Sequence, residues 1–275
     1  CFAKKCHKAK ILIRTGSEAS WRYGVEAYGA TDKTLDNLRS ATAAATGMGG
    51  IQACPVTTVL LEIGVEGDPL TVATCSSLTW WIENWIKSPS LRSRLQKTWE
   101  TTKKTVLVNN CPSWAKVCGP LGTAIANLAR INWNPLKANS WETEDGELWE
   151  VPESADGKNL TKPFVARVQE ACQKVLNSKA SCHRFGRGFE KGIDLLVYQK
   201  HITKLRKDGN NIDKGTLAAT AAGGNWPNER VAKSIPGTDP TCQFCGAPEQ
   251  DEAHLAWFCP CLNKIDDPRI QNSNF

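Results

Sequence analysis

The chain has 275 residues, of which 41% are hydrophobic and 23% are charged, a composition typical of a soluble globular protein with one or two cores of its own. No apolar run approaches the roughly 18 residues that span a bilayer, which argues against a membrane protein. Lysine and arginine number 34 against 28 acidic residues, so the charge permits binding to a polyanion without requiring it.

The first half of the chain predicts a succession of helices. A short basic helix is expected from Lys4 to Arg14, and a second helix is capped by Thr31 and ended by Gly47. Asp68 and Pro69 have the form of an N-cap followed by a proline at the first helical position. The long helix that they begin has apolar residues at helical spacing, which places a stripe of tryptophans in the core: Leu70, Leu78, Trp81, Ile82, Trp85 and Ile86. A helix capped by Ser88 or Ser90 and another over Pro120–Ile131 should follow.

The pattern changes between residues 133 and 162. Asn134-Pro135, an acidic stretch over 142–150 and Asp156-Gly157 predict a linker or a small irregular or hairpin insertion. The acidic residues are interpreted as a solvated loop, because no histidine or second acidic cluster accompanies them. Helices are expected again over 163–176, 188–205 and 214–222.

Twelve cysteines are many for an intracellular protein, but their placement argues against a disulfide framework. Four of them cluster at 242–261 around a histidine, and several others lie in apolar helical patterns. The chain opens at Cys1 without the succession of residues that marks a secretory signal. We therefore expect a reduced, intracellular protein, and a chain that is a fragment of a longer one; the nuclear and cytoplasmic compartments are not distinguished.

The strongest motif is a Cys3His set with the spacing of a structural zinc site, formed by Cys242, Cys245, His254 and Cys259. Two cysteines three residues apart can present both sulfurs to one ion from a tight turn, and three thiolates with one imidazole leave no open coordination position. One structural zinc ion is expected. Leu255, Trp257 and Phe258 are expected to pack around it, and Cys261 could replace Cys259 as a ligand.

Two basic stretches are candidate phosphate-binding surfaces or, equally, solvated helix faces. The first contains Lys4, Lys5, Lys8, Lys10 and Arg14 without an acidic residue. The second sets seven basic residues against only Glu190 and Asp194: Arg184, Arg187, Lys191, Lys200, Lys204, Arg206 and Lys207.

Both ends of the chain resemble one family. The C-terminal end contains Thr216-Leu217-Ala218, Gly223-Gly224-Asn225-Trp226-Pro227 and Arg230, followed by Cys242-Gln-Phe-Cys-Gly, Glu252-Ala-His254-Leu and Phe258-Cys259-Pro260. These motifs look like the zinc-binding region after the polymerase core of non-LTR retrotransposon reverse transcriptases. The N-terminal end contains Arg14-Thr15-Gly16, Tyr23-Gly24-Val25-Glu26, Leu35, Leu38-Arg39 and the alanine-rich helix. This part of the chain resembles the helical thumb of that family. These anchors cover about a third of the residues, in the order of the family.

The resemblance implies an RNA-directed DNA polymerase as the parent enzyme, but the paired palm aspartates that would hold its metal ions are not found. Asp266-Asp267 precedes Pro268 in a polar tail, beyond the zinc ligands. The palm and fingers are expected upstream of Cys1, and no catalytic activity is expected of this chain alone.

The predicted fold is mainly α: a thumb-like helical region at 1–132, a linker or irregular insertion at 133–162, a helical connector at 163–235, a zinc knuckle at 236–262 and a polar tail at 263–275. The expected function is binding of RNA or of a template–primer duplex. Three alternatives stay open: a zinc-stabilised structural or protein-interaction module, a relic of a decayed element, and a hydrolase, which the presence of only four histidines disfavours. The oligomeric state is not predicted.

Overall fold

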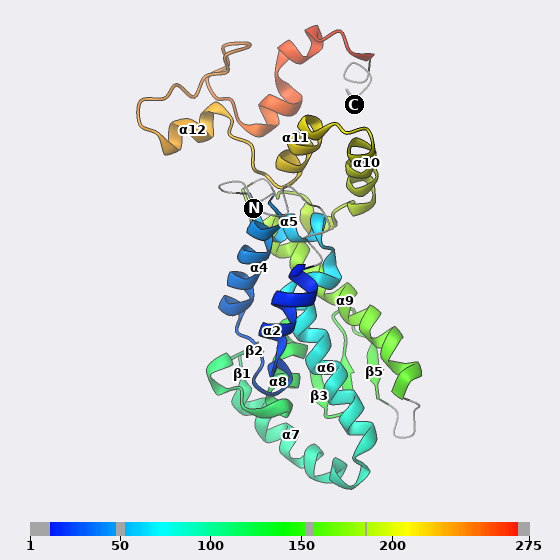
Figure 1. Ribbon diagram of the computed structural model, residues 1–275. Helices are drawn as coiled ribbons and strands as arrows, with labels where there is room; N and C mark the ends of the chain where they lie inside the picture. The colour runs from blue at the N-terminus through cyan, green and yellow to red at the C-terminus, as the bar shows by residue number, and fades with distance from the viewer. Residues whose placement is uncertain (1–11, 48–52, 152–156, 185, 269–275) are drawn as a thin grey trace. The chain divides into compact units, whose positions relative to one another are not determined.

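The computed structural model describes residues 12–47, 53–151, 157–184 and 186–268 (Figure 1). The fold is mainly helical, as predicted, and the chain divides into two compact units, Cys1–Ala222 and Gly223–Phe275. In the described parts of the chain no helix combines the length and the apolar character needed to cross a membrane.

The first unit contains most of the secondary structure. Its helices are a π-helical turn at Ile13–Ser17, α2 (Glu18–Arg22), α3 (Val25–Tyr28), α4 (Asp32–Thr46), α5 (Pro55–Glu62), α6 (Pro69–Lys87), α7 (Arg92–Val106), α8 (Gly119–Arg130), α9 (Gly157–Ser181), α10 (Leu195–Lys207) and α11 (Asn211–Ala221). Short 3-10 turns lie at Val65–Gly67, Pro89–Leu91, Trp114–Lys116 and Phe189–Lys191. Strands β1 (Leu107–Val108) and β2 (Cys111–Pro112) form a small antiparallel pair.

The predicted helix boundaries hold where a cap is formed by local residues. The Thr31 hydroxyl accepts the backbone N–H of Thr34 at the start of α4, and Gly47 ends that helix with a φ of 77°. The Asp68 carboxylate accepts the N–H of Leu70 and begins α6.

Two predicted helix starts are wrong. The helix expected from residue 163 begins earlier, at Gly157, and includes Pro163. The helix expected from residue 188 begins at Leu195, because Gly188 and Gly192 have φ values of 97° and 113° that interrupt a helix. The Asp194 carboxylate caps α10 instead, and α5 was not predicted.

The core of the first unit surrounds α6. This helix packs against α3, α8 and α9, and α9 lies beside it in Figure 1. Trp81, Trp85 and Trp99 are buried, and the rings of Trp81 and Trp99 are 5.5 Å apart. The prediction that the tryptophan stripe of this helix belongs to the core is therefore confirmed for Trp81 and Trp85, whereas Trp80 is exposed.

The segment predicted as a linker or irregular insertion, 133–162, is an ordered part of the core over its described residues. Strands β3 (Asn134–Lys137), β4 (Ser140–Glu142) and β5 (Leu148–Glu150) form an antiparallel sheet in the order β3–β4–β5. Trp133 and Trp141 are fully buried and pack against the ring of Phe164 on α9 at 6.1 and 5.7 Å. The packing of these two tryptophan rings on Phe164 holds the sheet to α9.

The acidic residues of this segment do not form a free solvated loop. Glu144 accepts a 2.7 Å hydrogen bond from Arg167, and Asp145 accepts bonds from Arg167 and Lys174. Burial raises the pKa of Glu144, but the bonds from Arg167 and Lys174 outweigh burial and lower it. These contacts fix the β4–β5 turn onto α9.

The second unit contains α12 (Asn228–Ser234), a π-helical turn at His254–Phe258 and a 3-10 turn at Pro260–Lys264. The expected boundary between connector and knuckle was residue 236. The second compact unit begins at residue 223, and its helix α12 is hydrogen-bonded to the metal-site loop through Asn228.

Candidate metal centre

The first two candidate ligands, Cys242 and Cys245, lie in one tight loop. The Cys242 carbonyl accepts the N–H of Gly246, and the Cys242 N–H donates to the carbonyl of Ala247, both at 2.8 Å. Gly246 has a φ of 74°, a conformation that glycine adopts without strain. The loop therefore presents both sulfurs on the same side, as the spacing predicted.

The other two ligands, His254 and Cys259, are at the two ends of a π-helical turn. The N–H of Cys259 donates to the carbonyl of His254 five residues earlier, at 2.8 Å, which is the π-helical pattern. Asp251 accepts the N–H of His254 at 2.6 Å and fixes the start of the turn. This wider turn brings the imidazole and the thiol to one side.

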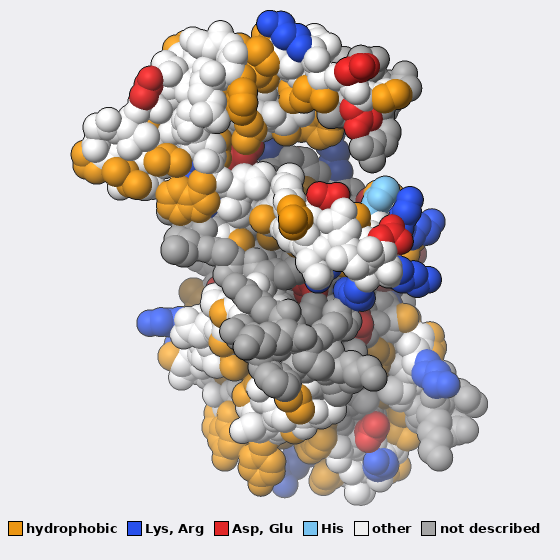
Figure 2. Space-filling model, turned by 45° about the horizontal axis from the view of Figure 1, so that its top comes forward, with side chains coloured by type: hydrophobic (Ala, Val, Ile, Leu, Met, Phe, Trp, Pro, Cys, Tyr) orange, Lys and Arg blue, Asp and Glu red, His pale blue; other side chains and the backbone are white. Residues whose placement is uncertain are grey.

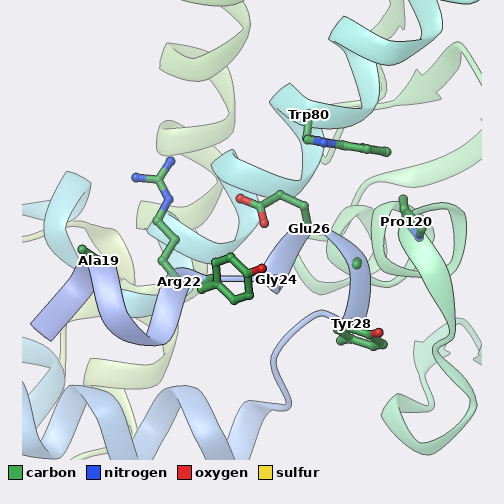
Figure 3. A pocket seen from close by; sticks show the side chains of 9 residues that line it. Ala19, Arg22, Gly24, Glu26, Tyr28, Trp80 and Pro120 are labelled. Atoms are coloured by element: carbon green, nitrogen blue, oxygen red, sulfur yellow. The ribbon is translucent and has the colours of Figure 1, made fainter.

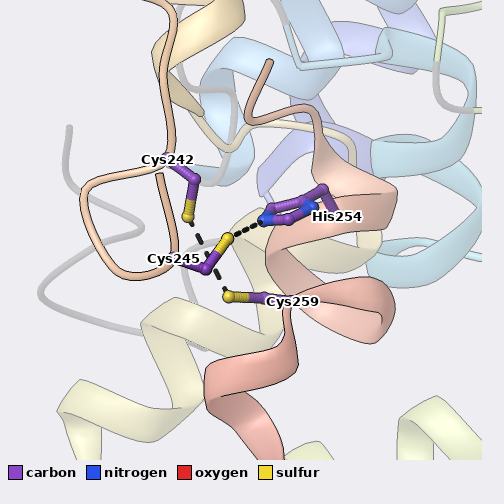
Figure 4. A group of neighbouring side chains, drawn as sticks. All are labelled: Cys242, Cys245, His254 and Cys259. Carbon is purple, nitrogen blue, oxygen red and sulfur yellow. Dashed lines mark hydrogen bonds between the residues drawn. The ribbon is translucent and has the colours of Figure 1, made fainter. Parts of the chain in front are cut away.

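Figure 4 shows the four side chains converging, and their ligand atoms all lie within 4.8 Å of one another. The sulfurs of Cys242 and Cys259 are 3.9 Å apart, and the Cys245 sulfur is 3.2 Å from Nε2 of His254. Two sulfurs held at about 2.3 Å from a tetrahedral ion would lie roughly 3.8 Å apart. The donor set and its spacing therefore fit a four-coordinate metal ion, and the predicted ligands are brought together.

Hydrogen bonds around the centre favour the thiolate that a metal ion requires. Burial raises the pKa of Cys242, but the N–H groups of Phe244 and Cys245, with the side chains of Gln250 and His254, lower it to about 6. At Cys245 the N–H of Ala247 lowers the pKa, whereas burial and the neighbouring thiols raise it, and the net shift is upward. Of these two thiols, Cys242 is therefore the better prepared to ionise.

A buried glutamine, Gln250, supports the centre, and the sequence analysis did not single it out. Its Nε2 donates to the Cys242 sulfur at 3.3 Å, and its Oε1 accepts the N–H of Asn228 at the start of α12. Its backbone carbonyl accepts the N–H of Glu229. No motif in the sequence marks this residue, because its partners come from a different stretch of the chain.

The expected apolar packing around the metal is wrong at two positions. Trp257 is 67% exposed and Phe258 is 72% exposed, while Leu255 is half-buried. The π-helical turn directs His254, its first residue, and Cys259, which follows its last residue, toward the other ligands. The side chains of Trp257 and Phe258, which lie between these two, project outward. Cys261 donates to the carbonyl of Phe244 and is not in the ligand cluster.

The remaining cysteines do not form a second centre among the described residues. Cys54 and Cys172 are buried, and Cys75 is half-buried. Cys111, Cys118 and Cys182 are exposed free thiols.

The candidate phosphate-binding residues are described only in part. Lys4, Lys5, Lys8 and Lys10 lie outside the described residues, and Arg14 lies in the first π-helical turn, where its side chain is not described. Arg184 and Arg187 are exposed in the segment before α10. Lys191 is exposed in the 3-10 turn Phe189–Lys191. The remaining four are exposed on α10 itself: Lys200, Lys204, Arg206 and Lys207.

Helix α10 is amphipathic, with one buried and one basic side. Tyr198 and Ile202 pack against Leu61 and Ala218, and the Tyr198 hydroxyl donates to Glu62 at 2.9 Å. Lys200, Lys204 and Lys207 recur at intervals of four and three residues and share an exposed face. Figure 2 shows Lys and Arg side chains gathered on the side of the molecule where α10 lies.

The two units differ in charge. Residues 223–275 carry four basic and seven acidic side chains, a net charge of −3, whereas residues 1–222 carry 30 basic and 21 acidic side chains, a net charge of +9. The positive charge of the chain therefore belongs to the unit without the metal centre.

Comparison with protein-family models, with curated proteins and with solved structures gave no match to this chain.

Proposed function

We propose that this chain is the thumb-like, connector and zinc-binding part of a retroelement reverse transcriptase, in which the Cys3His group holds one structural zinc ion and α10 contacts the phosphates of RNA or of a template–primer duplex. A closed set of three thiolates and one imidazole has no open position for a substrate. The role of the ion is to hold the two ligand-bearing turns together in a unit with little core of its own.

The basic face of α10 is the observation that carries the nucleic-acid assignment. The helix contains no acidic residue, and Lys200, Lys204 and Lys207 form no ion pair within the described residues. Exposed lysines at successive turns match the spacing of phosphates along a backbone in a way that dispersed charges do not. Two acidic residues flank the helix: Asp194, which caps its start, and Asp208, one residue beyond its end.

The residues that carry the family resemblance also support the proposal, because they pack on one another. Arg230 is buried, donates to the backbone carbonyls of Gly223 and Asn225, and lies over the ring of Trp226 at 4.9 Å. The Gly-Gly-Asn-Trp-Pro segment is thus fixed to α12 by a single guanidinium. A motif whose members depend on one another in this way is a more specific signature than isolated identities.

The test is salt-dependent RNA binding by two charge-matched variants of the full chain. The first replaces Lys200, Lys204 and Lys207 with glutamine. The second replaces three exposed basic residues of α7, Arg94, Lys97 and Lys104, and so removes the same charge from another helix. The α10 variant should lower the slope of log affinity against log salt by about 2 to 3, while the α7 variant should change it little.

Equal effects of the two variants would show that net charge alone matters and would overturn the α10 assignment. A wild-type affinity that is the same at low and high salt would overturn the nucleic-acid function itself.

A second candidate function is a zinc-stabilised protein-interaction module. Phe244, Trp257 and Phe258 are more than half exposed on the acidic unit that holds the metal centre. Exposed aromatic side chains with little positive charge nearby are typical of a protein-binding surface. Capture of a partner protein that survives nuclease treatment and is lost in a Trp257→Ala variant would favour this function.

A further inference from the structure

Three large aromatic side chains of the first unit are exposed around one recess of about 770 Å³. Tyr23 is 94% exposed, Tyr28 is 78% exposed and Trp80 is 38% exposed. Arg22, Glu26 and Pro120 complete its lining. Figure 3 shows Trp80 reaching toward the recess from α6, and Glu26 and Tyr28 from the short helix α3. Aromatic side chains concentrated around one hollow indicate a binding surface.

The short helix α3, which forms one wall of this recess, is held by hydrogen bonds from two core helices. Val25, at the start of α3, is buried, and its carbonyl accepts hydrogen bonds from Ser77 of α6 and from the N–H of Gly29. The carbonyl of Ala27 accepts a bond from Thr123 of α8 at 3.2 Å. Helices α6 and α8 therefore fix the short helix α3, which carries Glu26 and Tyr28. A ligand would meet this wall of the recess already formed.

Gly24 supplies the turn that leads into α3. Its φ is 78°, a conformation that residues with a side chain rarely adopt. The turn allows Tyr23 and Glu26, on either side of it, to line the same recess.

We propose that this recess binds an unpaired base of a single-stranded nucleic acid, with guanine preferred. The inference rests on the nucleic-acid function proposed above. Aromatic rings stack on any base, so Trp80, Tyr23 and Tyr28 supply the platform. The Glu26 carboxylate, which forms no ion pair within the described residues, can accept two hydrogen bonds from adjacent donors. Guanine presents two such N–H groups side by side on its Watson–Crick edge.

Charge favours this occupant over a peptide. The recess belongs to the unit with a net charge of +9, which attracts a polyanion. Arg22 stands at the rim, 3.7 Å from Glu18, with its side chain about half exposed, and can reach a phosphate next to the stacked base. Glu26 repels phosphate but not the edge of a base, so the recess selects the base rather than the backbone.

The experiment uses the full chain and a single-stranded oligoribonucleotide that carries one 2-aminopurine, whose fluorescence falls when it stacks on an aromatic ring. A Tyr28→Ala/Trp80→Ala variant should lose the quenching and bind about tenfold more weakly. Its salt slope should stay that of the wild type, because no phosphate contact is removed. A Tyr23→Phe/Tyr28→Phe variant keeps the rings and should keep the quenching.

Glu26 is tested separately with two oligonucleotides that differ only by guanine or uracil at one position. The wild type should prefer guanine, and Glu26→Gln should lose that preference while the quenching persists. Unchanged far-UV circular dichroism would establish that the variants are folded.

Quenching that survives in the Tyr28→Ala/Trp80→Ala variant would overturn the inference, although salt-dependent binding through α10 would still stand. Binding of a proline-rich peptide that these substitutions abolish, with RNA binding unchanged, would assign the recess to a protein partner instead. A wild-type chain with no salt-dependent RNA affinity would overturn both this inference and the proposed function.

Discussion

Arg39 and Asp68 form a buried, two-bonded ion pair that joins α4 to the beginning of α6. Nε of Arg39 donates to one carboxylate oxygen at 2.6 Å and Nη2 donates to the other at 2.9 Å. Both residues are at most 1% exposed. The same carboxylate accepts the N–H of Leu70, so one side chain both caps α6 and orients α4 against it.

Replacing Arg39 with methionine should lower the free energy of unfolding by about 3–5 kcal/mol, because Asp68 would remain buried without its counter-ion. Equilibrium unfolding in urea measures this change. Asp36, the more exposed partner of Arg39, provides the control, and Asp36→Asn should cost less than about 1 kcal/mol. Similar costs for the two variants would contradict a special role for the buried pair.

The buried thiols of Cys75 and Cys172 should make the first unit unstable at alkaline pH. Burial raises the pKa of Cys75 to about 12, and burial, with the nearby Cys75 thiol, raises that of Cys172 well above its ordinary value. In the unfolded chain both thiols ionise near pH 9, so the unfolded state loses protons first. Stability is therefore complete below about pH 9 and is lost as the pH rises toward 12.

The measurement is the urea midpoint under reducing conditions at several pH values between 8 and 11. Cys75→Ala should remove about one proton from this linkage. The slope of the free energy of unfolding against pH should then be smaller by roughly 1.4 kcal/mol per pH unit. Tyr198, whose pKa burial raises to about 12, adds a decline above pH 10 that this substitution leaves unchanged. Cys182→Ala removes an exposed thiol and should not alter the decline; an equal effect at both positions would exclude burial as the cause.

The helix caps could be predicted from the sequence because the chemistry of a cap is local. Thr31 and Asp68 each bond a backbone N–H two or three residues ahead, so the whole interaction lies within one short stretch. The three-stranded sheet could not be predicted in this way. Its stability comes from Trp141 packing on Phe164, and neither residue signals in sequence that the other is its partner.

In the candidate metal centre, too, local features could be predicted from the sequence and contacts between distant residues could not. The spacing of Cys242 and Cys245 is a local property of a tight turn, and it predicted the candidate site. The supporting bond from Gln250 to Cys242 links the site to α12 through residues that have no motif. The exposure of Trp257 follows from a π-helical turn, which the sequence pattern gave no reason to expect in place of an ordinary helix.

The metal centre itself gives the last prediction: the purified chain should contain about one zinc ion, and His254→Ala and Cys245→Ser should each abolish it. Cys261→Ser is the matched control. The Cys261 thiol lies two residues after the ligand Cys259, but it donates to the carbonyl of Phe244 and is not in the ligand cluster. Elemental analysis of protein prepared under reducing conditions measures the content. Loss of zinc in Cys261→Ser together with its retention in Cys259→Ser would show that the ligand set is wrong. Because the ion should stabilise residues 223–275 by on the order of 10 kcal/mol, a chelator should unfold that unit while the helical core around α6 keeps its own transition.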